Sequence, residues 1–149
     1  MRSDRFEMFS TSTVRLIKDV QALKAEKMAR YGLKGTNAVC LCCVYESSDG
    51  LTAAELSSLG EIDKAQVSRC MTELTAKGYV YRDDRDGKRY KQKYRLTAEG
   101  ARVAADIFCC FKEIEDALHR SASKEALDTF YSTLQLMCDN FAALVEKHK

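Results

Sequence analysis

Apolar residues recur at helical spacing along most of the 149-residue chain, and this pattern predicts a mainly α-helical protein. A first helix is expected at about residues 5–30. A second, apolar nearly all round and therefore buried, is expected over 35–47. A short third helix is expected at 51–60. A fourth helix is expected at about 64–77 and a hairpin at 79–96, followed by two more helices separated by a break at 119–123.

Capping residues mark where the third and fourth helices begin and end. Thr52 with Glu55 three residues later is the pattern of a capping box, in which each side chain bonds a free backbone amide. Asp63 is expected to cap the fourth helix in the same way, with Gln66 reaching back to it. Gly78 is expected to end that helix, because glycine tolerates the left-handed backbone. A short turn therefore joins the two helices.

After the fourth helix the apolar period changes from helical to two, which predicts a β-hairpin. Asp86-Gly87 is a strong signal for a two-residue turn at its tip. With that turn, Tyr79 lies opposite Tyr94 as an aromatic cross-strand pair, and Asp84 lies opposite Arg89.

The hairpin segment is strongly basic, although the chain as a whole is not. The chain has 24 Lys and Arg against 22 Asp and Glu, a net charge of +2, whereas residues 80–97 alone hold seven cations. Residues 61–97 hold ten cations and six anions (+4), which leaves 14 cations and 16 anions elsewhere (−2). This distribution indicates local contact with phosphate, the alternative being a solvated hairpin face. Three cations near the tip are candidates for DNA phosphates or the minor groove: Arg85, Lys88 and Arg89.

Helix, short turn, helix and basic hairpin follow one another in the order of a winged helix-turn-helix. On the fourth helix Val67, Met71 and Leu74 form an apolar stripe, and hydrogen-bonding side chains lie outside it. The candidate DNA-binding residues on this helix are Lys64, Gln66, Ser68, Arg69 and Thr72. Arginine can donate two hydrogen bonds to guanine, and glutamine can pair with adenine. For Arg69 the alternative is an ion pair with Glu73, one helical turn away.

Four short motifs carry a resemblance to a known family: LTAAEL at the third helix, VSR on the fourth, KGYV before the hairpin and LTAEG after it. With them the chain resembles the MarR-type (multiple antibiotic resistance regulator) transcriptional regulators, most clearly over about residues 33–105. The resemblance implies one domain over 1–149. In it, a winged-helix region at about 33–97 is flanked by dimerisation helices at about 5–30 and 98–147.

The resemblance also implies a function: a sequence-specific DNA-binding regulator, acting as a homodimer on a palindromic operator, commonly as a repressor, with an activator as the alternative. Members of the family release DNA when a small aromatic acid, a metal ion or an oxidant alters the dimer. Motif position would place Ser68 and Arg69 on the DNA. The hairpin departs from the family pattern of Asp, one residue, then Arg, because the expected Asp falls at Lys88. We therefore expect Asp84 to support Arg89 instead.

The seven cysteines form no C-x-x-C pair and the chain has two histidines, so neither a zinc site nor another metal or cofactor is expected. The thiols are expected to be reduced and packed as small hydrophobes. Cys70 is the candidate redox residue, because it lies on the fourth helix beside Arg69, which could shift its pKa. An adduct there would disturb DNA docking. A thiol-based redox-sensing regulator is therefore one alternative function.

Other functional classes have less support in the sequence. The longest apolar run, residues 38–45, is far too short to span a membrane, and residues 1–10 lack the apolar core of a secretory signal, so a cytoplasmic protein is expected. No catalytic motif is present, and we expect no enzyme activity. A winged-helix protein-interaction module that does not bind DNA is the remaining alternative. Such modules usually lack the basic hairpin and polar fourth helix found here.

Overall fold

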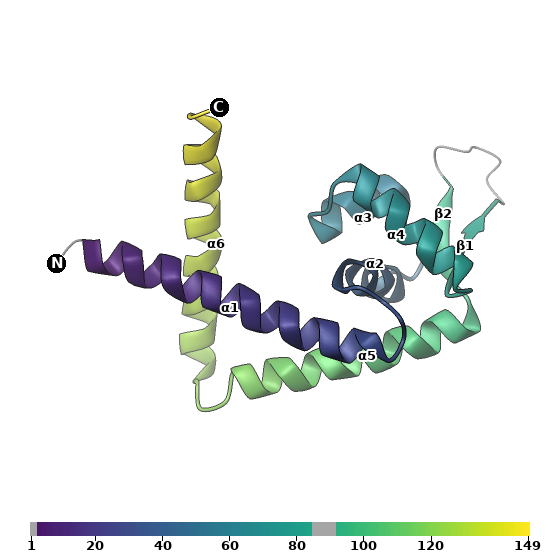
Figure 1. The fold of residues 1–149 in the computed structure, drawn as a ribbon, viewed down its shortest axis with the longest axis horizontal. Coiled ribbons are helices and arrows are strands. Elements are labelled where there is room, and N and C mark those ends of the chain that lie inside the picture. Colours follow the sequence, from purple (N-terminus) through teal and green to yellow (C-terminus); the bar gives the residue numbers. More distant parts are fainter. Residues whose placement is uncertain (1–2, 85–91) are drawn as a thin grey trace. The chain divides into compact units, whose positions relative to one another are not determined.

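The computed structural model describes residues 3–84 and 92–149, which form helices and one antiparallel hairpin (Figure 1). In chain order the elements are α1 (Ser3–Ala29), α2 (Gly35–Glu46), α3 (Ala53–Gly60), α4 (Lys64–Ala76), β1 (Val80–Asp83), β2 (Lys93–Leu96), α5 (Ala98–Leu118) and α6 (Lys124–Glu146). The predicted fold class, mainly α with a winged helix-turn-helix and a β-hairpin wing, is confirmed.

The chain divides into two compact units, Met1–Cys110 and Phe111–Lys149. The first unit holds the hydrophobic core, in which side chains of α2, α3, α4, the hairpin and the first part of α5 are buried together. Fully buried members of this core include Leu41, Leu56, Met71, Leu74 and Ile107. As predicted, α2 is among the most buried helices.

The starts of α3 and α4 largely follow the predicted caps. The Thr52 hydroxyl accepts from the Glu55 amide, and the Glu55 carboxylate accepts from the Thr52 amide at 2.7 Å, so the capping box is confirmed. Asp63 caps α4 by accepting from the Gln66 amide at 2.9 Å. The Gln66 side chain does not reach back to Asp63, and this part of the prediction was wrong. It donates instead to the Thr36 hydroxyl on α2 at 3.3 Å.

Ser57 closes the turn between α3 and α4. Its carbonyl accepts from the Ile62 amide at 3.1 Å, and its hydroxyl donates to the Ile62 carbonyl at 2.5 Å. Glu61, between them, takes up the left-handed backbone with φ of 50°. Because both hydrogen bonds end on one residue of the turn, they fix the direction in which the chain enters α4.

The hairpin pairs in a register that differs from the predicted one by three residues. Arg82, and not Tyr79, lies opposite Tyr94, and Asp83 lies opposite Lys93. The predicted turn residues, Asp86-Gly87, lie outside the described residues. The predicted alternation along β2 does hold for Tyr94, which is buried, and for the two cations on either side of it, which point the other way.

A long-range contact holds β2 on its other side. Leu51 forms a bridge with Tyr94, donating to its carbonyl at 3.1 Å and accepting from its amide at 2.7 Å. Gly50 precedes this bridge with φ of +73°, and a Cβ there would lie 2.7 Å from the Tyr94 carbonyl oxygen. β2 is therefore held both by β1 and by a segment more than 40 residues earlier in the chain.

α5 begins at a tight junction with the end of α4. The Thr97 amide donates to the Tyr79 carbonyl at 3.0 Å, and the Thr97 hydroxyl donates to the Gly78 carbonyl at 2.6 Å. The same hydroxyl accepts from the Gly100 amide at 3.0 Å, so Thr97 caps α5. Gly78 has φ of +75°, the left-handed conformation predicted for the end of α4.

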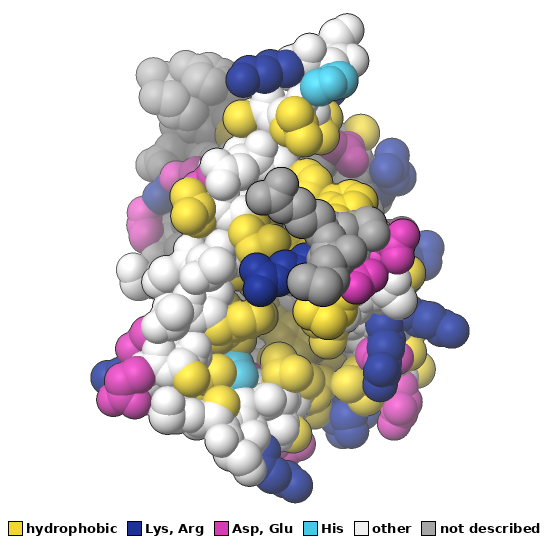
Figure 2. All heavy atoms as spheres, turned by 90° about the vertical axis from the view of Figure 1, so that its left-hand side faces the viewer, with side chains coloured by type: hydrophobic (Ala, Val, Ile, Leu, Met, Phe, Trp, Pro, Cys, Tyr) yellow, Lys and Arg dark blue, Asp and Glu magenta, His cyan; other side chains and the backbone are white. Residues whose placement is uncertain are grey.

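The helices predicted to dimerise leave their apolar side chains largely uncovered. Figure 2 shows hydrophobic side chains gathered in open patches on one face. Exposed apolar residues on α1 and α6 include Phe6, Val14, Ile17, Leu23, Phe130, Leu134, Phe141 and Leu144. α6 buries none of its described side chains. No helix in the described parts of the chain is long and apolar enough to cross a membrane.

The close packing at the junction of α4 and α5 generates a stability prediction. A Cβ added at Gly100 would lie 1.8 Å from the Tyr79 carbonyl oxygen. We expect Gly100→Ala to lower the free energy of unfolding by about 1–3 kcal/mol or more, because backbone must move to admit the methyl group. Urea unfolding followed by circular dichroism, at fixed protein concentration, measures the change.

Gly35→Ala at the start of α2 is the matched control. No described atom lies within 4 Å of the Cβ that this change adds, so its effect should stay within about 0.5 kcal/mol. Equal stability of the Gly100 and Gly35 variants would contradict the packing at the junction.

Candidate nucleic-acid interface

α4 buries one side and presents most of its predicted DNA-binding side to solvent. Val67, Met71 and Leu74 are buried, as predicted, and Cys70 is buried with them. On the other side Lys64, Ser68, Arg69 and Thr72 are exposed, and Gln66 is half-buried. The structure therefore brings the five predicted residues together along one helix, with Gln66 at the edge of the exposed surface.

Two hydrogen bonds tie α4 to the first turn of α2. Asn37, which is 2% exposed, donates to the Glu73 carboxylate at 2.9 Å, and Gln66 donates to Thr36. The Glu73 carboxylate therefore binds Asn37. Within residues 3–84 and 92–149 it forms no ion pair with Arg69, which was the alternative role for that residue. The Arg69 side chain is therefore exposed to solvent, while α4 itself is hydrogen-bonded to α2.

Hydrogen bonds inside the protein limit what two of the predicted contacts can offer. Thr72 donates its hydroxyl proton to the Ser68 carbonyl at 2.9 Å, so this hydroxyl can only accept from a ligand. Gln66 uses one amide hydrogen on Thr36. Paired recognition of adenine by Gln66 would therefore have to use the remaining donor and the carbonyl oxygen, or break the bond to α2.

Two of the hairpin cations are neutralised by carboxylates. Lys93 binds Asp49, and Arg95 bridges Asp49 at 2.9 Å and Asp83 at 2.6 Å. Hydrogen bonds from Lys93 and then Arg95 hold the pKa of Asp49 below its usual range, so this carboxylate stays charged. Lys93 and Arg95 therefore add little net charge to the hairpin, although both were counted in the basic segment.

Arg82 belongs to this surface and was not singled out from the sequence. It lies opposite Tyr94, donates to the Tyr94 hydroxyl from Nε (3.1 Å) and Nη2 (2.9 Å), and sits 5.2 Å from the centre of that ring. A groove of about 360 Å³ between α4 and the hairpin is lined by Met71, Thr72, Thr75, Ala76, Arg82 and Tyr94. With the correct hairpin register, the sequence would have predicted that Arg82 lies opposite Tyr94 and therefore on this side of the hairpin.

The predicted tip of the hairpin lies outside the described residues. The roles of Arg85, Lys88 and Arg89 in DNA binding therefore stay predictions. Asp84 is described, and its carboxylate accepts a hydrogen bond from the Gln92 amide group at 2.8 Å. The register that placed Asp84 opposite Arg89 was wrong, and support of Arg89 by Asp84 remains a prediction without that basis.

Cys70, the candidate redox residue, is buried beside Cys40. Burial raises the pKa of the Cys70 thiol and outweighs the opposing effects of a hydrogen bond with Cys40 and of the Arg69 charge. Burial likewise raises the pKa of Cys40 to about 12. Both thiols are therefore protonated near neutral pH, whereas oxidation needs a thiolate. A redox role for Cys70 stays a prediction.

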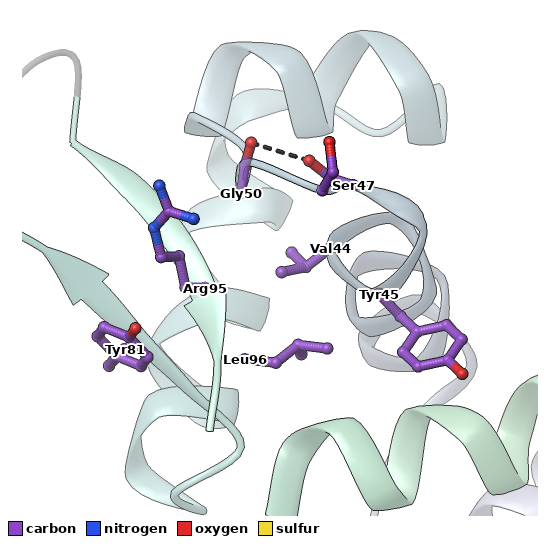
Figure 3. A pocket seen from close by; sticks show the side chains of 8 residues that line it. Val44, Tyr45, Ser47, Gly50, Tyr81, Arg95 and Leu96 are labelled. Carbon is purple, nitrogen blue, oxygen red and sulfur yellow. Dashed lines mark hydrogen bonds between the residues drawn. The ribbon is translucent and has the colours of Figure 1, made fainter. Parts of the chain in front are cut away.

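A second pocket, of about 260 Å³, lies between the end of α2 and the opposite side of the hairpin (Figure 3). Its lining is Val44, Tyr45, Ser47, Ser48, Gly50, Tyr81, Arg95 and Leu96. The volume is near the lower limit of about 300 Å³ for small-molecule sites. Because Arg95 already binds two carboxylates, the described lining of this pocket offers no uncompensated cation that would select an acidic ligand.

Comparison with known proteins agrees with this geometry. Residues 31–89 match the sequence model of the MarR family. No curated protein sequence matches the chain. A MarR transcriptional regulator from Methanosarcina mazei Go1 is similar in structure, with a TM-score of 0.73, 24% identity and coverage of 93% of this chain and 92% of the other.

Two further solved structures superpose with a TM-score of 0.80. The S. aureus MepR–DNA complex is 19% identical and covers 89% of this chain and 96% of its own. A MarR protein from Peptoclostridium difficile DA00132 is 18% identical, with coverage of 95% and 92%. The fold is that of a winged helix-turn-helix protein. The match of residues 31–89 to the MarR family model agrees with the resemblance carried by the sequence motifs.

The contact between α2 and α4 generates a second stability prediction. Glu73→Ala should lower the free energy of unfolding by about 1–3 kcal/mol, because it leaves the buried Asn37 amide without its acceptor. Glu73→Gln keeps an acceptor of the same size and should cost less. Urea unfolding of both variants checks this. If Glu73→Ala were no less stable than Glu73→Gln, the contact would not be anchoring α4.

Proposed function

We propose that the protein is a sequence-specific DNA-binding transcriptional regulator that acts as a homodimer. The observation that carries this proposal is the exposed polar side of α4. This helix is hydrogen-bonded to α2, and the basic hairpin lies next to it. In the proposed complex α4 enters the major groove and the hairpin contacts the flanking backbone or minor groove.

The positions of the polar side chains along α4 support base recognition. Lys64, Ser68 and Arg69 lie in the half of the helix where winged helices usually meet base edges. Arg69 can donate two hydrogen bonds to one guanine, and the fixed position of α4 preserves that geometry. Two solved structures of this fold are described as a MepR–DNA complex and as MepR in a DNA-binding conformation. DNA is therefore the ligand that we assign to this surface.

The exposed apolar side chains support a homodimer. α6 buries none of its described side chains, and α1 leaves most of its apolar stripe open. Large apolar surfaces of this kind usually mark interfaces. We assign residues 5–30 and 98–147 to dimerisation and 33–97 to DNA binding within one functional domain, 1–149. Two-fold symmetry of such a dimer would present two copies of α4 to a palindromic operator.

The regulatory part of the proposal is repression relieved by a ligand, and it rests on the family resemblance. A small aromatic acid is the class of effector that the resemblance suggests. We expect a regulator of this kind to act in the cytoplasm, with neither an enzymatic step nor a cofactor. The rival protein-interaction module has less support, because the polar side of α4 and Arg82 are both kept exposed.

DNA binding can be tested with duplexes selected by the protein from a randomised library. Fluorescence anisotropy should show tight binding to a selected duplex, weaker binding to its scrambled counterpart, and a steep loss of affinity between about 0.05 and 0.2 M salt. Arg69→Ala should weaken binding to the selected duplex by about 1–3 kcal/mol and relax its base preference, because a base contact is lost.

Arg102→Ala provides the control for charge, since Arg102 is exposed on α5 and pairs with Glu99 and Asp106. It should bind both duplexes like the wild type. Equal binding of the two duplexes by the wild type would contradict sequence specificity. Complete absence of binding at low salt would favour the protein-interaction module.

The dimer can be tested by sedimentation equilibrium. The wild type should have about twice the 16.8 kDa mass of the chain. Leu134→Glu, which places a charge in the exposed apolar stripe of α6, should shift the protein toward the monomer. Ser132→Glu places the same charge about 200° around the helix and should leave the dimer intact. A monomeric wild type at micromolar concentration would rule out the proposed assembly.

A further inference from the structure

The groove between α4 and the hairpin contains an exposed guanidinium beside the proposed DNA-reading surface. One wall is formed by Met71, Thr72, Thr75 and Ala76 of α4, and the other by Arg82 and Tyr94 of the hairpin. Thr72 is also one of the five predicted contacts on α4. The groove is therefore continuous with that surface, and on the hairpin it is lined by the cross-strand pair of Arg82 and Tyr94, both described residues.

Arg82 differs from its neighbours on the hairpin because the fold does not neutralise it. Lys93 and Arg95 lie on the other face of the hairpin and bind carboxylates of Asp49 and Asp83. The described partners of Arg82 are the hydroxyl and the ring of Tyr94, and both are uncharged. Among these three cations, Arg82 is the one that retains its full charge toward a ligand.

Tyr94 also fixes the orientation of Arg82. Of the five N–H groups of the guanidinium, Nε and one hydrogen of Nη2 are used on the Tyr94 hydroxyl, and three remain for a ligand. Tyr94 itself is 6% exposed and exchanges two backbone hydrogen bonds with Leu51. Arg82 is thereby ordered before any ligand arrives, which reduces the entropy lost on binding.

We propose that Arg82 binds a phosphate of the DNA backbone next to the groove that α4 enters, with Tyr94 as its positioning residue. A planar guanidinium with several free N–H groups suits the oxygens of a phosphodiester. The inference rests on the proposed function and adds a contact that is separate from the hairpin tip. Because phosphates are the same in every sequence, Arg82 should contribute affinity and position, and not base preference.

The experiment compares Arg82→Ala with the wild type on the selected and the scrambled duplex over the same salt series. We expect binding to both duplexes to weaken on the order of 3- to 10-fold, with little change in their ratio. The slope of log affinity against log salt should become shallower by about one, as one phosphate contact is lost. Arg69→Ala, in parallel, should change the ratio, and Arg102→Ala should change neither quantity.

Two conservative variants separate phosphate binding from a structural role in the hairpin. Arg82→Lys keeps a cation and should retain the salt slope. It should lose part of the affinity, because lysine lacks the planar guanidinium that can bind two phosphate oxygens at once. Tyr94→Phe keeps the aromatic ring and leaves the charge of Arg82 in place, but it removes the hydroxyl that positions Arg82. It should therefore weaken binding to both duplexes without changing the salt slope. Urea unfolding of each variant checks that the fold persists. If Arg82→Ala fails to fold, these two variants decide between the two roles.

The outcomes distinguish this inference from the proposed function. If Arg69→Ala weakens binding while Arg82→Ala keeps the wild-type affinity and slope, Arg82 is structural and DNA binding by α4 stands. Arg82 is likewise structural if Tyr94→Phe and Arg82→Lys both bind like the wild type. If the wild type binds neither duplex at low salt, the proposed function and the Arg82 contact are both overturned.

Discussion

The junction of Thr97 and Gly100 with the backbone of Gly78 and Tyr79 is the constraint on which the rest of the proposed DNA-reading surface depends. Through it, the last turn of α4, the first residue before β1 and the first turn of α5 share one set of hydrogen bonds. Gly100 has no side chain because the Tyr79 carbonyl occupies that space. The hairpin therefore leaves α4 in one direction only, and the groove that holds Arg82 exists because that direction is fixed.

Local signals predicted the parts of the fold that local chemistry determines. The caps at Thr52 and Asp63 and the left-handed Gly78 were all found where the sequence placed them. The hairpin register was wrong because its prediction depended on the Asp86-Gly87 turn signal alone. In the structure β2 is also bridged to Leu51 through Tyr94, and no pattern within the hairpin records a partner so far away in the chain.

At the candidate site, too, the sequence could not predict which charges and hydrogen-bonding groups would be used by distant residues. A count of cations could predict a basic hairpin, but not that Asp49, 44 and 46 residues away, would neutralise Lys93 and Arg95. Helical spacing could place Gln66 and Glu73 on α4. It could not show that α2 uses both of them through Thr36 and Asn37. Which polar residues remain available to a ligand is decided by tertiary neighbours, and Arg82 stands out only once those neighbours are known.

The exposure of α6 bears on stability as well as on assembly. A helix of 23 residues in water gains little from propensity alone, and most helices in proteins are stabilised by burying an apolar face. α6 has such a face, in Leu134, Phe141 and Leu144, and leaves it exposed in the single chain. Burial against a second copy would therefore supply energy that the isolated chain lacks. In the proposed dimer, folding of α6 and association are one equilibrium, so the stability of the protein should depend on its concentration.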